Sequence, residues 1–62
     1  MFFKEEVVKM MTDMVHNMNT ELAKQQNMTD DQIEDMKKQI TPQLDHVNGM
    51  LYDLLKTNGV IP

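Results

Sequence analysis

The apolar residues of this chain recur with a helical period almost from end to end, with one short interruption. In the first half, one row contains Val8, Met11, Val15, Met18 and Leu22, and a second row contains Phe3, Val7, Met10 and Met14. At about 100° per residue the two rows lie side by side as one broad apolar face. The pattern predicts a helix from about residue 3 to residue 26 that contacts more than one neighbouring helix.

The opposite side of this first helix is polar and is expected to face solvent. It carries Glu5, Glu6, Lys9, Thr12, Asp13, His16, Asn17 and Thr20. His16 and His46 are interpreted as solvated surface residues, because neither has the His/Glu spacing of a di-metal bundle. The alternative is that His16 and Asp13, three residues apart, form a weak metal site or a mild pH sensor.

A strong turn signal follows the first helix. Thr29 and Gln32 have the spacing of a capping box, and Met28 and Ile33 have the spacing of a hydrophobic staple. The second helix is therefore expected to begin at Asp30. A connection this short makes the two helices antiparallel neighbours.

The second helix is predicted from about residue 30 to residue 58, where Gly59 has the position of a left-handed C-terminal stop. Pro42 lies inside it, so either one helix continues with a kink or restarts on nearly the same axis, or Thr41 caps a separate third helix. We favour the first alternative because the apolar phase is unbroken across the proline. The apolar stripe contains Ile33, Met36, Ile40, Leu44, Val47, Leu51 and Leu54.

These features predict an all-α antiparallel helical hairpin in which residues 1–62 form a single domain. Small domains usually need a disulfide, a metal or a partner chain for stability, and this chain has no cysteine. We therefore expect two hairpins to dimerise into a four-helix bundle that buries the remaining apolar surface.

The composition excludes several classes of function. With no Ser, no Cys and no Gly-rich phosphate loop, we expect neither enzyme activity nor a bound cofactor or metal. A net charge of -4 and the lack of arginine argue against nucleic acid as a partner. No apolar run is long enough for a membrane helix, and no signal peptide follows Met1, so we expect a complete, cytoplasmic small gene product.

The eight methionines are the most unusual part of the composition. Met10, Met11, Met14 and Met18 lie on one face of the first helix, and Met36 lies on the second. Thioether side chains can fill an irregular core, adapt to a partner helix or bind Cu(I), and we favour packing and partner binding because the spacing is the one that packing requires.

Tyr52 projects to the polar face of the second helix, where it is either a partner contact or an isolated surface tyrosine. Together with the broad apolar face, it completes the predicted interface for self-association or partner binding. That interface contains Phe3, Val7, Met10, Met11, Met14, Val15, Met18, Leu22, Met36 and Tyr52.

The functional hypothesis is a small non-catalytic regulatory protein that acts by protein–protein interaction. It would be an inhibitor or adaptor of the kind that viruses and plasmids encode to modulate host proteins. In chain length and helix layout the sequence resembles the small plasmid-encoded RNA-regulating helical hairpin that dimerises, although no motif matches residue by residue. This resemblance implies RNA binding as an alternative function, and a Met-rich Cu(I) protein is a further alternative.

Overall fold

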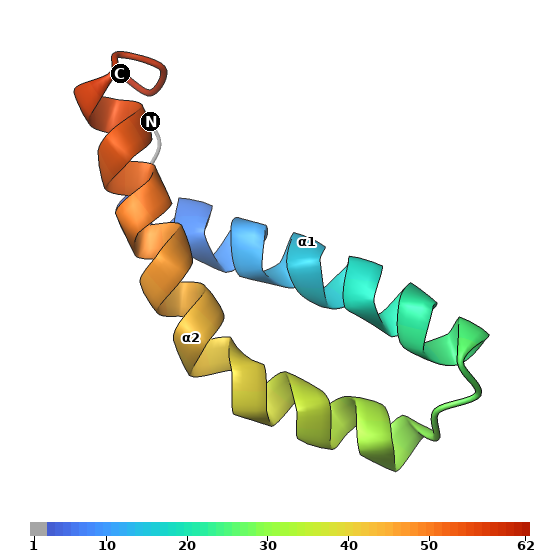
Figure 1. The fold of residues 1–62 in the computed structure, drawn as a ribbon. Helices are drawn as coiled ribbons and strands as arrows, with labels where there is room; N and C mark the ends of the chain where they lie inside the picture. The colour runs from blue at the N-terminus through green and yellow to red at the C-terminus, as the bar shows by residue number, and fades with distance from the viewer. Residues whose placement is uncertain (1–2) are drawn as a thin grey trace.

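The computed structural model describes residues 3–62, and it contains two α-helices joined by a short turn (Figure 1). Helix α1 spans Lys4–Gln25 and helix α2 spans Asp30–Thr57. The helices pack against each other, and the start of α1 lies at the same end of the molecule as the end of α2 (Figure 1). The predicted all-α helical hairpin is confirmed, with each helix end within one residue of its expected position.

The signals at the two ends of α2 act as the sequence predicts. The hydroxyl of Thr29 accepts a hydrogen bond from the Gln32 amide at 3.2 Å, and the Gln32 side chain accepts one from the Thr29 amide at 2.9 Å. At the other end, Gly59 has a φ of 76°, and the Val60 amide donates to the Leu55 carbonyl at 2.9 Å. These local bonds satisfy backbone groups that the ends of a helix leave unpaired.

The end of α1 has the same type of backbone stop as the end of α2, although the sequence has no glycine there. Asn27 has a φ of 62°, and its amide donates to the Lys24 carbonyl at 3.1 Å. The next amide, that of Met28, donates to the Ala23 carbonyl at 3.1 Å. Asparagine tolerates the left-handed conformation better than most residues, so it can take the place of glycine here.

Helix α2 runs through Pro42 without a break, so the alternative of a separate third helix is wrong. Pro42 is exposed, so the backbone bond that its ring removes is lost on a side of the helix that faces solvent. The hydroxyl of Thr41 donates to the Lys37 carbonyl at 2.6 Å, one turn back. Hydroxyl bonds of this kind often accompany a bend in a helix, and the kink itself stays a prediction.

The contact between α1 and α2 buries polar as well as apolar residues. The buried residues are Ala23, Ile33 and Tyr52, together with the polar Thr12 and Asn48. Two expectations were therefore wrong: Thr12 belongs to the interior, and Tyr52 is only 5% exposed and is not a surface residue.

The buried line on α2 explains these corrections. Beyond Leu44 it continues through Asn48 and Tyr52 in steps of four residues, whereas the expected stripe continues through Val47 and Leu51. A four-residue step advances about 40° around the helix, so the buried line moves across the surface as two helices cross. The sequence pattern identified the apolar stripe on α2 correctly. The prediction that the second half of this stripe packs against α1 was wrong.

Neither of the helices described in residues 3–62 has an apolar stretch long enough to cross a membrane.

Candidate interaction surface

One flank of the hairpin exposes large apolar side chains from both helices. On α2, Leu51 is 41% exposed, and its neighbours Val47, Met50 and Leu54 are more exposed. On α1, Met14 is the most exposed of these side chains, at 64%. The residues of α1 and its N-cap that share this exposure are Phe3, Met10, Met14, Met18 and Leu22. Together these nine side chains from the two helices are called the apolar flank.

A groove of about 330 Å³ lies between the helices on this flank. We call it the methionine groove, and its lining is apolar except for one asparagine: Met11, Met14, Val15, Met18, Asn48 and Leu51. Methionine side chains are flexible and polarizable, so a groove lined by them can adapt to the shape of an inserted side chain. The geometry therefore suits an amphipathic helix laid across the two helices of the hairpin.

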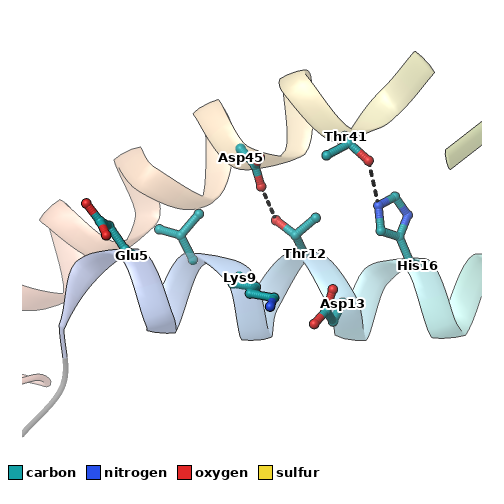
Figure 2. A pocket seen from close by; sticks show the side chains of 8 residues that line it. Glu5, Lys9, Thr12, Asp13, His16, Thr41 and Asp45 are labelled. Atoms are coloured by element: carbon teal, nitrogen blue, oxygen red, sulfur yellow. Dashed lines mark hydrogen bonds between the residues drawn. The ribbon is translucent and has the colours of Figure 1, made fainter. Parts of the chain in front are cut away.

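The opposite flank has a second groove, of about 530 Å³, and seven of its eight lining residues are polar or charged. Figure 2 shows Glu5, Lys9 and Asp13 along α1 at this groove, with Asp45 and Thr41 facing them from α2. The two flanks thus differ in chemistry. We therefore expect a partner that buries apolar surface to bind at the methionine groove.

A chain of hydrogen bonds crosses the interface beneath the polar groove. The hydroxyl of Thr12 donates to the Asp45 carboxylate at 2.8 Å (Figure 2). The same hydroxyl accepts from Nδ2 of Asn48 at 3.0 Å. Because Asn48 also lines the methionine groove, these bonds connect the polar flank to the apolar one. Polar pairs of this kind fix the register of two helices more sharply than apolar contacts do.

His16 is half-buried at the same interface, which corrects the expectation that it is a solvated surface residue, whereas His46 is exposed as expected. Nε2 of His16 lies 2.9 Å from Oγ1 of Thr41, as Figure 2 shows. Since the Thr41 hydroxyl already donates its proton to Lys37, Nε2 of His16 is the donor in this contact. Nδ1 of His16 is buried and has no hydrogen-bond partner among the described residues.

Two ion pairs involve lysines of the hairpin. Nζ of Lys4 lies 3.1 Å from the Asp53 carboxylate and joins α1 to α2, and Nζ of Lys37 lies 3.6 Å from the Glu34 carboxylate within α2. Within residues 3–62, the structure places no group of three or more histidine and acidic side chains that could hold a metal ion.

The predicted interface residues divide into three groups in the structure. Phe3, Met10, Met14, Met18 and Leu22 are exposed. Val7, Met11, Val15 and Met36 are half-buried, and Tyr52 is buried. The groove brings together Met11, Met14, Val15 and Met18.

The sequence reasoning missed the α2 half of the apolar flank: Val47, Met50, Leu51 and Leu54. Except for Met50, these residues had been assigned to the contact between the two helices. The width of the face on α1 was the available signal, because a face that broad leaves part of itself outside a two-helix contact.

Replacing Thr12 by alanine is expected to lower the free energy of unfolding by about 1–3 kcal/mol, because the buried Asn48 amide and the Asp45 carboxylate lose a hydrogen-bond partner. Urea unfolding followed by circular dichroism measures the loss. Thr20→Ala is the matched control on the same helix, since the buried Thr20 hydroxyl has no partner among the described residues. Equal losses in the two variants would show that Thr12 does not contribute through its hydrogen bonds.

Comparison of the chain with models of protein families, with curated proteins and with solved structures found no match.

Proposed function

We propose that this chain is a small non-catalytic regulatory protein that acts by protein–protein interaction and associates with itself. The observation that supports the proposal is the apolar flank, where nine large apolar side chains from both helices are exposed. Three of them, Met14, Met18 and Leu51, meet at the methionine groove, and large exposed apolar surfaces mark interaction sites.

The difference between the contact surface of the two helices and the apolar flank supports the same proposal. The contact within the hairpin includes the polar Thr12, Asn48 and His16, whereas several large apolar side chains of both helices remain exposed: Met10, Met14, Met18, Leu51 and Leu54. A chain that used its apolar residues only for its own core would place them between the helices. The exposed methionines instead suit an adaptable surface for a second helix.

In this proposal the protein is an inhibitor or adaptor. Its small size is typical of proteins that viruses and plasmids encode to modulate host proteins. Two hairpins associate through the apolar flank into a four-helix bundle. No observation on residues 3–62 specifically favours the RNA-binding or the Cu(I)-binding alternative.

The proposal is tested by affinity capture from an extract of the producing cells, with three immobilised forms of the protein. Met18→Glu adds a charge to the methionine groove, and the matched control Asn17→Glu adds the same charge at an exposed position beside it. We expect the wild type and Asn17→Glu to retain a protein that Met18→Glu loses. If all three forms retain the same proteins, the apolar flank is not the interaction site.

A further inference from the structure

We propose that a second copy of this chain occupies the methionine groove, with the α1 helices of the two copies antiparallel and Met14 beside the two-fold axis. This inference rests on the proposed function, because it names the partner of the same apolar flank and the arrangement of the two chains.

The accessible surface of the hairpin is large enough to supply such an interface. The chain of 7.3 kDa exposes 4982 Å². The scaling for compact monomers gives about 4,200 Å² at this mass, so the excess is about 800 Å². A stable interface of ordinary size buries about 800 Å² on each partner. The excess surface of one hairpin therefore equals the contribution of one copy to a dimer.

The shape of the hairpin leads to the same conclusion. Its radius of gyration is 13.7 Å, and it measures 41 by 18 by 17 Å. A compact domain of this length has a radius of gyration of about 10.6 Å. Two hairpins laid flank to flank are about as wide as two layers of helices, which is the cross-section of a four-helix bundle. A dimer is therefore more compact than the elongated single hairpin.

The methionine row on α1 determines where the two-fold axis passes. Met10, Met14 and Met18 follow one another at intervals of four residues, and all three are exposed. In a two-fold interface the same surface is used on both copies, so the middle of a row pairs with itself. Met14 is the middle of this row and lines the groove, and Met10 of one copy then faces Met18 of the other.

The helix dipoles favour the antiparallel orientation of the two α1 helices. Each helix carries partial positive charge at its N-terminus and partial negative charge at its C-terminus. An antiparallel pair places opposite ends side by side, whereas a parallel pair brings like partial charges together at each end.

Single-cysteine variants test this arrangement directly, because the natural chain has no cysteine. Purified Met14→Cys is oxidised at micromolar concentration, and the disulfide-linked dimer is followed by non-reducing electrophoresis. We expect it to form at least roughly tenfold faster than in the control Asn17→Cys, because bound copies hold their thiols at a high effective concentration. Equal rates would overturn the placement of Met14 at the axis.

The orientation is tested by mixing Met10→Cys with Met18→Cys. The antiparallel arrangement predicts that the mixed dimer of the two variants forms in excess over either homodimer, whereas a parallel arrangement predicts an excess of the homodimers. The substituted residues are all exposed in the hairpin, so the contact between α1 and α2 is expected to stay intact in each variant.

The failure of this inference is distinguishable from failure of the proposed function. If cross-linking is slow while Met18→Glu still loses a captured protein, the second copy is not the occupant and the interaction function stands. If cross-linking is fast and no protein is captured, the dimer stands and the regulatory role through a foreign partner is wrong.

Discussion

Met14→Asp is expected to remain a folded hairpin and to lose its ability to dimerise. Met14 is 64% exposed in the single chain, so an aspartate there keeps its contact with water and costs only about 0.5 kcal/mol in helix propensity. At a two-fold axis the substitution instead buries two like charges side by side. Each buried, unpaired carboxylate costs several kcal/mol, so the dissociation constant should rise at least about a hundredfold.

Size exclusion with light scattering measures this effect across a series of concentrations. We expect the wild type to reach twice the chain mass of 7.3 kDa and the variant to stay at that mass. Asn17→Asp adds the same charge at an exposed position outside the apolar flank and should dimerise like the wild type. A wild type that is monomeric at every concentration would contradict the dimer, and so would a dimeric Met14→Asp.

Tyr52→Ala is expected to unfold the hairpin. Tyr52 is 5% exposed and is the only aromatic residue among the buried ones in the described part of the chain. Truncating a buried aromatic side chain costs about 3–5 kcal/mol through lost apolar contacts and the cavity that remains. A domain this small has only about 3–5 kcal/mol of stability from its core, so the loss removes most of it.

Far-ultraviolet circular dichroism at low protein concentration should show a largely unfolded Tyr52→Ala. The control is Leu51→Ala, one position away on the apolar flank, where the side chain is 41% exposed. This variant should remain helical and show only weaker self-association. If Tyr52→Ala keeps the helicity and the unfolding midpoint of Leu51→Ala, the orientation of α2 described above is wrong.

Local features of the fold were predictable because the interactions that determine them span only a few residues. The start of α2 at Asp30 depends on hydrogen bonds between Thr29 and Gln32, three residues apart. Its end depends on the positive φ of Gly59. The stop at Asn27 was the exception, since asparagine is a weaker signal than glycine for the same conformation.

The candidate site was predictable only in its α1 half. The methionine row on α1 has no competing role, and the structure places Met11, Met14 and Met18 along one groove. The α2 half was missed because Val47, Leu51 and Leu54 satisfy the period of a contact with α1 as well as that of an exposed stripe. Periodicity identifies a face and does not identify the neighbour that covers it.

The sequence by itself determined two amphipathic helices, their ends and the antiparallel turn between them, because capping bonds and helical period act over one or two turns. Only the tertiary structure decided which edge of the apolar face α2 covers. That choice depends on bonds from Thr12 to Asp45 and Asn48, which lie 33 and 36 residues away in the chain. These bonds draw a polar edge of α1 into the interior and leave Met10, Met14 and Met18 exposed, on the surface that we propose a second chain covers.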